Sequence, residues 1–347
     1  EEVCAAVRKR VDFGVFAYGN LPQKRFTDAV CAWYKKRYGL TLNPQAVRHS
    51  QGLMTGALWM ILNAYTRPGD KILVQPPVYN TFGIVIRGAG RFVENNDLIL
   101  KDGRYEIDFD DLEKKTADPR VRILLVCNPA NPVGRVWTRE ELTRMYEICK
   151  KNHTLIVSDE IHGDIVYAPH RHIPYFSLSE EIADNVIVMG SPSKTFNLAC
   201  FYSAYVVIHN EELREQYGIV YEDYHFDYNY LGIEALITAY NDCEYYADQQ
   251  NEYLHKNIEL VKSFLAQAMP EVKVIEPEAT YLLWIDFRAW GLSSPELVRL
   301  FESAGVKLNS GANYGVPGDG FLRLNVATQT TVLEEALRRM KKAAENR

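Results

Sequence analysis

The chain has 347 residues, of which 47% are hydrophobic and 24% charged, a composition typical of a globular protein rather than a disordered one. Its formal net charge of −6 argues against a nucleic-acid or anionic-membrane partner. No apolar run approaches the roughly 20 residues that a membrane-spanning helix needs, so the sequence predicts no membrane insertion.

The cysteines and histidines suggest neither a disulfide framework nor a metal site. Six cysteines are scattered along the chain without a C-x-x-C pair, which favours reduced thiols and a cytoplasmic location. His162, His170 and His172 are close in sequence but lack the paired ligand spacing of a zinc site. We therefore expect no bound metal.

The chain begins with EEVCAAVRKR, which has the pattern of an amphipathic helix and lacks the apolar core of a signal peptide. We expect the natural protein to start further upstream. From about residue 43 to residue 208, short apolar runs alternate with helical patterns such as Glu140–Lys151. The runs that we predict as strands are Lys71–Gln75, Arg122–Cys127, Thr154–Ser158, Val186–Met189 and Ser203–Ile208.

These runs are rich in β-branched residues and do not alternate strictly, as expected of strands that are buried on both faces. Their alternation with helices predicts an α/β domain with a mainly parallel sheet. After Asp242 the pattern changes to a long helix (about residues 244–269) and then to mixed strands and helices. We predict a large domain at residues 25–242 and a smaller α+β domain formed by residues 1–24 and 243–347.

Polar groups follow three successive predicted strands. The motif NPANPVG, with Asn131, follows the second strand; Asp159 follows the third, and Lys194 follows the fourth. Taken singly, each has an ordinary explanation: a proline-braced turn, a helix N-cap, and a lysine whose stem lies on apolar surface. Together they indicate one pocket, because ligands of open α/β sheets bind at the carboxyl ends of the strands.

An amine, a carboxylate and an amide suit the chemistry of pyridoxal phosphate. A lysine forms a Schiff base with the aldehyde, and a carboxylate keeps the pyridine nitrogen protonated so that the ring can accept electrons. An amide donor near the phenolic oxygen completes the conjugated system. The trio therefore predicts a pyridoxal-phosphate site.

Four ordered motifs, SPSKTFNLA, NPANPVG, SDEIH and FLRLNVA, resemble those of fold-type I pyridoxal-phosphate enzymes of the class I/II aminotransferase superfamily. They look closest to its cystathionine β-lyase branch, the cysteine–sulfur lyases that include the maltose-regulon protein type. The resemblance covers nearly the whole chain. It implies a large domain whose mainly parallel sheet is sandwiched by helices, together with a smaller α+β domain.

The resemblance assigns roles to the residues at the strand ends. Lys194 would form the Schiff base and then act as general base and acid, and Asp159 would pair with the pyridinium nitrogen. Asn131 would donate toward the phenolic oxygen. Tyr79 would stack on the ring, and we count it with Lys194 and Asp159 as catalytic. Ser191 would reach the cofactor phosphate.

Further assignments concern the phosphate and the substrate. Leu53 and Met54 occupy the family's positions for amide donors to the phosphate, although the same glycine-containing motif could begin a helix that binds nothing. Tyr18 resembles the tyrosine that a neighbouring subunit lends to the phosphate, which implies a homodimer with shared active sites. Arg323 could be an ordinary surface residue, but the resemblance makes it a bidentate clamp on the substrate α-carboxylate.

Three positions differ from the wider superfamily. His162 stands where many aminotransferases have a tyrosine, and it fits a cofactor-binding role in the lyase branch. Tyr202 replaces an arginine that commonly grips the phosphate, and the sequence does not show what compensates. Asn80, after Tyr79, stands where some lyases carry a further aromatic residue.

The branch resemblance implies β-elimination from L-cystathionine, L-cysteine or a cysteine S-conjugate, which yields a thiol, pyruvate and ammonia. An aminotransferase acting on an L-amino acid is the first alternative, because both reactions begin when Lys194 removes the α-proton. About 1.4 kcal/mol in relative barriers changes their ratio tenfold, a difference that sequence does not resolve. A lyase fold with a regulatory protein-binding role is the second alternative.

Overall fold

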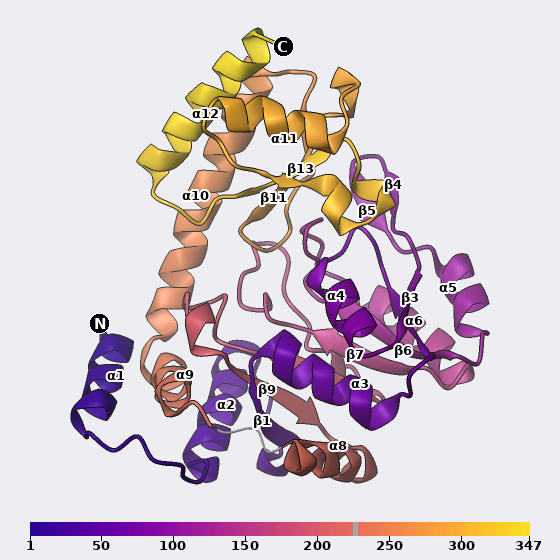
Figure 1. The fold of residues 1–347 in the computed structure, drawn as a ribbon, viewed down its shortest axis with the longest axis vertical. Coiled ribbons are helices and arrows are strands. Elements are labelled where there is room, and N and C mark those ends of the chain that lie inside the picture. Colours follow the sequence, from indigo (N-terminus) through magenta and orange to yellow (C-terminus); the bar gives the residue numbers. More distant parts are fainter. Residues whose placement is uncertain (225–227) are drawn as a thin grey trace.

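The computed structural model describes residues 1–224 and 228–347, and Figure 1 shows a large domain below a smaller one, with helix α10 (Glu244–Ala268) running up into the smaller domain. A seven-stranded sheet forms the centre of the large domain, in the order β1-β9-β8-β7-β6-β2-β3. Its strands are β1 (Val47–Gln51), β2 (Lys71–Val74), β3 (Phe92–Asn95), β6 (Val121–Cys127), β7 (Leu155–Asp159), β8 (Val186–Gly190) and β9 (Ser203–Ile208).

Strand directions place most carboxyl ends at one edge of this sheet. The pairs β3–β2, β2–β6, β6–β7 and β7–β8 are parallel. Strand β9 is antiparallel to both β8 and β1, so β1 has the same direction as β8. The five predicted strands and the mainly parallel sheet are therefore confirmed, and the amino end of β9 lies at the edge where β8 ends.

Alternate residues of the central strands pack into two separate cores, one on each face of the sheet. In β6, Leu124 and Val126 contact one core, whereas Ile123 and Leu125 contact the other. The helices covering the first face are α2 (Gln23–Tyr38), α5 (Phe109–Thr116), α6 (Arg139–Lys151), α7 (Glu180–Ala183) and α9 (Tyr230–Asp242). The other face is covered by α3 (Trp59–Tyr65), α4 (Thr81–Gly88) and α8 (Glu211–Asp223). Burial on both faces explains the continuous apolar runs.

The C-terminal part of the chain has a third core of its own. Its four-stranded antiparallel sheet has the order β10-β11-β13-β12. The elements are α10, β10 (Lys273–Val274), β11 (Leu282–Asp286), α11 (Ser294–Ser303), β12 (Asn309–Ser310), β13 (Phe321–Asn325) and α12 (Thr330–Glu345). A hairpin of the large domain, β4 (Ile99–Lys101) and β5 (Arg104–Glu106), approaches this domain (Figure 1) and accepts a hydrogen bond from Trp284 Nε1 at Tyr105 Oη, 3.0 Å.

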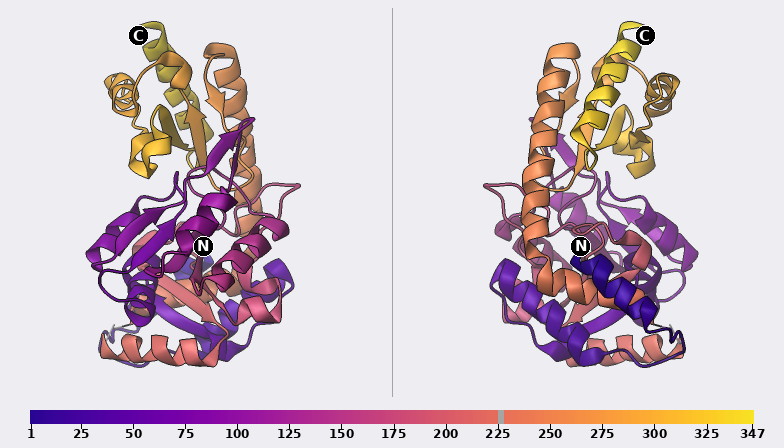
Figure 2. Two further views of the ribbon diagram at one scale, coloured as in Figure 1. Left: turned by 90° about the vertical axis from the view of Figure 1, so that its right-hand side faces the viewer. Right: turned by 90° about the vertical axis from the view of Figure 1, so that its left-hand side faces the viewer.

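The first helix, α1 (Glu2–Asp12), lies along α9, away from the small-domain sheet, as the right-hand view of Figure 2 shows. Its Val3 packs against the large-domain core, and the Glu2 carboxylate accepts a hydrogen bond from Tyr245 Oη at 3.0 Å. The grouping of residues 1–24 with the small domain stays a prediction. An amphipathic pattern reveals an apolar side but not the surface that receives it.

All six cysteines are free thiols, in agreement with the absence of a paired motif; the cytoplasmic location stays a prediction. Among the described helices, none combines the length and the apolar character needed to cross a bilayer.

Candidate active site

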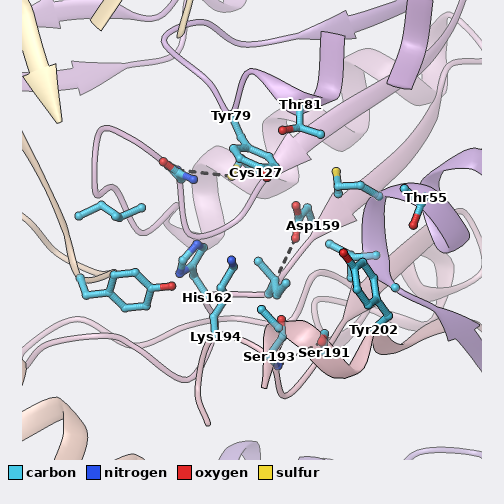
Figure 3. A pocket seen from close by; sticks show the side chains of 18 of the residues that line it. Thr55, Tyr79, Thr81, Cys127, Asp159, His162, Ser191, Ser193, Lys194 and Tyr202 are labelled. Carbon is cyan, nitrogen blue, oxygen red and sulfur yellow. Dashed lines mark hydrogen bonds between the residues drawn. The ribbon is translucent and has the colours of Figure 1, made fainter. Parts of the chain in front are cut away.

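A cavity of about 520 Å³ lies where the carboxyl ends of the large-domain strands meet the small domain. Figure 3 shows Tyr79, Asp159, His162 and Lys194 directed toward one space, with Thr55 and Tyr202 on the side opposite His162. Of the predicted site residues, those that line this cavity are Leu53, Met54, Tyr79, Asn131, Asp159, His162, Ser191, Lys194 and Arg323.

Asp159, the last residue of β7, is buried in the floor of the cavity with 3% of its surface exposed. The backbone N–H of Ile161 donates to its Oδ1 at 3.1 Å. Burial raises the pKa of Asp159 to about 7, although this hydrogen bond and the Lys194 ammonium act in the opposite direction. No described cation forms an ion pair with the carboxyl group, so it is suited to accept a hydrogen bond from a cationic group of a ligand.

This burial predicts a pH-dependent gain in stability for Asp159→Asn in the ligand-free protein. Because the folded-state pKa is raised from its ordinary 3.8 to about 7, unfolding releases a proton between these values, and the folded state loses stability as pH rises through that window. At pH 8 the variant should exceed the wild type by on the order of 4 kcal/mol in free energy of unfolding, and at pH 5 by much less.

Denaturant unfolding at the two pH values measures this difference. The exposed Asp223→Asn, at the end of α8, is the matched control and should show no such pH-dependent gain. An equal effect of Asp159→Asn at pH 5 and pH 8 would contradict the raised pKa.

Lys194 is half-buried, and Figure 3 shows its amine beside His162 inside the cavity. Within the described part of the chain, no hydrogen bond or ion pair holds this amine. Burial lowers the pKa of Lys194; Asp159 opposes the shift and Arg323 adds to it. The ordinary explanation is a lysine whose amine reaches bulk water. It does not fit Lys194, because this amine lies in the cavity and loses its proton more readily than that of an exposed lysine.

Arg323, in β13, is held by neutral groups. Its Nη1 donates to Asn131 Oδ1 at 3.0 Å and its Nη2 to Asn309 Oδ1 at 3.1 Å, and the guanidinium lies 5.0 Å from the ring centroid of Tyr314. Its buried Nε has no hydrogen-bond partner, and no carboxylate among the described residues pairs with it. Burial lowers the pKa of Arg323 from its ordinary value. A desolvated guanidinium without a counter-ion is suited to bind a carboxylate of a ligand.

His162 is buried at the side of the cavity. Its ring packs edge-on against the ring of Tyr281, and the two ring centroids are 5.6 Å apart. Burial, followed by the charges of Lys194 and Arg323, lowers its pKa to about 3, so the imidazole is neutral at physiological pH. Its Nδ1 has no partner among the described residues and is available to a ligand.

Neutral donors line the end of the cavity next to η2 (Leu53–Leu58), a π-helical segment that continues into α3. Gly52, which precedes η2, has φ of +80°, and a Cβ there would lie 3.3 Å from the Tyr202 ring. Ser191 Oγ donates to the carbonyl of Ser203 at 2.8 Å, so its hydroxyl hydrogen is already used. The buried Ser203 Oγ has no partner among the described residues.

Sequence reasoning missed several cavity residues, namely Thr55, Thr81, Cys127, Ile161, Ser193, Ser203, Tyr281 and Asn325. Some carried a usable signal: Asn325 shares a strand face with Arg323, and Cys127 ends a predicted strand. Ser203 and Tyr281 carried none, because they reach the cavity from the starts of antiparallel strands.

Tyr18 is the exception among the predicted site residues. Its side chain is 91% exposed, and it lines a separate hollow beside Phe16 and Tyr230. Within a single chain, the structure does not bring Tyr18 to the cavity.

Comparisons with known proteins agree with this geometry. The family model for aminotransferase class I and II matches residues 2–340. The chain is 39% identical over 345 residues to cystathionine beta-lyase PatB of Bacillus subtilis (99% of this chain, 89% of that protein) and 28% identical over 338 residues to MalY of Escherichia coli (96% and 86%).

Two solved structures are similar throughout. Cystalysin from Treponema denticola, which contains pyridoxal 5'-phosphate, has a TM-score of 0.95 at 32% identity, covering 99% of this chain and 88% of that one. A pyridoxal-phosphate-bound C–S lyase from Staphylococcus hominis has a TM-score of 0.91 at 31% identity, covering 98% and 89%.

Proposed function

Because the chain belongs to the class I and II aminotransferase family, we propose that it is a pyridoxal-phosphate-dependent carbon–sulfur β-lyase that cleaves L-cystathionine, L-cysteine or a cysteine S-conjugate to a thiol, pyruvate and ammonia. The observation that carries the proposal is the convergence of Lys194, Asp159 and an Arg323 without counter-ion on one cavity.

The residues present fit the cofactor. Asp159 offers a buried carboxylate to a protonated ring nitrogen, and Tyr79 offers an aromatic face. Asn131 accepts from Arg323 through its carbonyl oxygen, which leaves its amide N–H groups available to the phenolic oxygen. When bound, pyridoxal phosphate supplies an electron sink that stabilises negative charge as a bond to the substrate α-carbon breaks.

The phosphate would be held mainly by neutral donors. On the lining of the cavity, Lys194 and Arg323 are the described cationic side chains, and both have other roles. The hydroxyls of Thr55, Ser193 and Ser203, together with the backbone N–H groups that begin η2, take the place of the arginine that Tyr202 replaces. Ser191 lines the cavity, but its hydroxyl hydrogen is donated to the carbonyl of Ser203 and is not available to the phosphate.

Lys194, Arg323 and His162 would then bind the cofactor and the substrate and transfer the α-proton. Lys194 would hold the cofactor covalently, and its lowered pKa favours the neutral amine that would accept the substrate α-proton. Arg323 holds the α-carboxylate through two parallel N–H donors and so orients the α-carbon toward Lys194. The neutral His162 packs beside the amine without adding a competing charge.

Space for the sulfur substituent lies beyond Lys194 and Tyr281. A second hollow of about 620 Å³ shares five lining residues with the first cavity, namely Ser193, Lys194, Ala199, Tyr281 and Asn325. Apart from Lys194, its described lining consists of uncharged side chains, such as Tyr246 and Gln250. A leaving thiol can therefore occupy a region next to the proton-carrying amine.

Incubating the purified holoenzyme with L-cystathionine in the absence of any keto acid tests the proposal. We expect pyruvate and thiol in equal amounts. A requirement for an added keto acid would overturn the lyase assignment in favour of an aminotransferase.

We also propose a homodimer in which Tyr18 reaches the partner's cofactor phosphate. The support is an exposed apolar segment in which Phe13, Phe16 and Tyr18 are 67%, 72% and 91% exposed. Contiguous exposed apolar residues commonly mark a protein–protein contact.

Mixing Tyr18→Ala subunits with Lys194→Ala subunits is expected to restore lyase activity that neither variant has alone. One site of the mixed dimer combines an intact lysine with an intact tyrosine from the other chain. Steady-state assays after co-refolding measure the recovery, and a mixture of Lys194→Ala subunits with subunits that carry both Tyr18→Ala and Lys194→Ala, which has no intact lysine, is the control. No recovery in the mixture would show that Tyr18 does not act across the interface.

A further inference from the structure

We propose that Asp164 is a positioning residue for the proposed lyase reaction: through the hydroxyl of Thr195, it fixes the turn that carries Lys194 against the loop that carries Asp159 and His162. The inference rests on the proposed function and concerns the same site.

The link joins two loops that follow neighbouring strands. Thr195, next to Lys194 in the chain, is 1% exposed and donates its hydroxyl hydrogen to Asp164 Oδ2 at 2.8 Å. Asp164 ends the segment Asp159–Asp164, whose first residue and His162 face the cavity. This hydrogen bond therefore connects the loop that begins at Asp159, the acid that faces the cavity, to the turn that carries the amine of Lys194.

Asp164 is held by neutral donors from other elements. Trp33 Nε1 lies 3.2 Å from each carboxylate oxygen, and Tyr38 Oη donates to Oδ1 at 2.8 Å; both residues belong to α2. Asn251 Nδ2, from α10, donates to the backbone carbonyl of Asp164 at 2.8 Å. With Thr195, these contacts tie together two site loops, a large-domain helix and the helix that leads to the small domain.

Phe196, which follows Thr195 in the chain, is also held by packing and a hydrogen bond. Phe196 packs edge-on against Trp33 at 5.5 Å and stacks with Tyr246 at 5.9 Å, centroid to centroid. Its backbone N–H donates to the carbonyl of Pro192 at 2.9 Å. The backbone on the C-terminal side of Lys194 is thus rigid, whereas its amine stays free of protein partners, as expected of a group that must first bind and then transfer a proton.

The carboxylate of Glu160 also anchors the loop formed by residues 159–164, but it does so without a hydrogen bond to the turn of Lys194. Glu160 accepts hydrogen bonds from Ser158 Oγ at 2.9 Å and from the backbone N–H of Tyr175 at 2.9 Å, and lies 3.0 Å from His172 Nε2. These contacts secure the loop to the large-domain core. Of the three carboxylates in the segment 159–164, Asp164 is the one that accepts a hydrogen bond from the turn of Lys194, so its bond with Thr195 sets the relative position of the two loops.

Thr195→Val tests the proposal, because valine keeps the shape of threonine and removes the hydrogen bond. A misplacement of about 1 Å at a reacting group costs on the order of 100-fold. We expect kcat for β-elimination to fall by roughly 10- to 100-fold with KM changed by less than about threefold, and Thr195→Ser to restore most of the loss. The borohydride-trapped linkage between Lys194 and added pyridoxal phosphate should also form more slowly in Thr195→Val.

Thr116→Val is the matched control. Thr116 is likewise 1% exposed and donates its hydroxyl hydrogen to a backbone carbonyl, that of Leu112 at 2.9 Å, but it lies in α5. We expect a similar loss of stability and unchanged kcat and attachment rate. Should Thr195→Val fold poorly, Asp164→Asn offers a second probe, because it leaves one acceptor oxygen for three donors and should slow attachment in the same direction.

Wild-type kcat and attachment rate in Thr195→Val would overturn the proposal, as would equal losses in Thr116→Val or a failure of Thr195→Ser to recover. These outcomes are distinct from a failure of the proposed function, which would appear in the wild type itself as turnover that needs an added keto acid or as the absence of a borohydride-sensitive visible absorbance band.

Discussion

Lys194→Ala is expected to lower the rate of β-elimination by roughly 10⁴-fold and to abolish the borohydride-sensitive absorbance of the holoenzyme. The substitution removes both the covalent attachment point and the group that carries the α-proton, and general acid–base catalysis alone contributes up to about 10⁴-fold. Pyruvate formation and visible spectra, measured on the same preparation, report the two losses separately.

Lys150→Ala is the control for this variant. Lys150 is an exposed lysine at the end of α6 that pairs with Glu181, and surface ion pairs of this kind contribute little to stability. It should retain wild-type spectra and rates. A Lys194→Ala protein that still trapped cofactor with borohydride would place the attachment point elsewhere and contradict the assignment of the site.

Arg323→Lys is expected to reduce kcat/KM by on the order of 100-fold, chiefly through KM. Lysine keeps the charge but cannot present two parallel donors to a carboxylate, and it loses the planar contact with Tyr314. Removing about 3 kcal/mol of binding corresponds to roughly that factor. Steady-state kinetics with L-cystathionine measure the change.

A substrate lacking the α-carboxylate makes this test specific. The wild type should strongly prefer the amino acid to its α-amide, and Arg323→Lys should prefer it much less. Arg288→Lys is the matched control, since Arg288 also lies over an aromatic ring, Phe321 at 4.8 Å, but pairs with Asp286 outside the cavity. An undiminished preference for the acid in Arg323→Lys would show that another group binds the carboxylate.

The strands that sequence could predict are those buried on both faces. Ile123–Cys127 in β6 and Leu155–Val157 in β7 are uninterrupted apolar runs, and both contain β-branched residues. In contrast, β1 reads VRHSQ and β3 reads FVEN, and neither was predicted. Strand β3 lies at the edge of the sheet with Phe92 and Asn95 exposed, so its sequence lacks the apolar run that reveals a buried strand.

The site residues that sequence could predict are those at the carboxyl ends of the predicted strands. Asp159 ends a parallel strand, Asn131 and Lys194 follow two others, and parallel strands bring their carboxyl ends to one edge of the sheet. Ser203 approaches the same edge because β9 runs in the opposite direction, which no local pattern reveals. The bond between Thr195 and Asp164 depends on how two loops pack, a tertiary property that spacing does not encode.

The buried acid at the end of β7 would make the stability of the folded chain depend on the bound cofactor. A newly made chain without the cofactor must keep that carboxyl group dehydrated with no ion-pair partner among the described residues, whereas the loaded chain would gain a positive nitrogen there. A ligand that binds the folded form shifts the population away from unfolded chains, on which cellular proteases act. Under vitamin shortage, degradation would therefore remove empty enzyme faster than loaded enzyme.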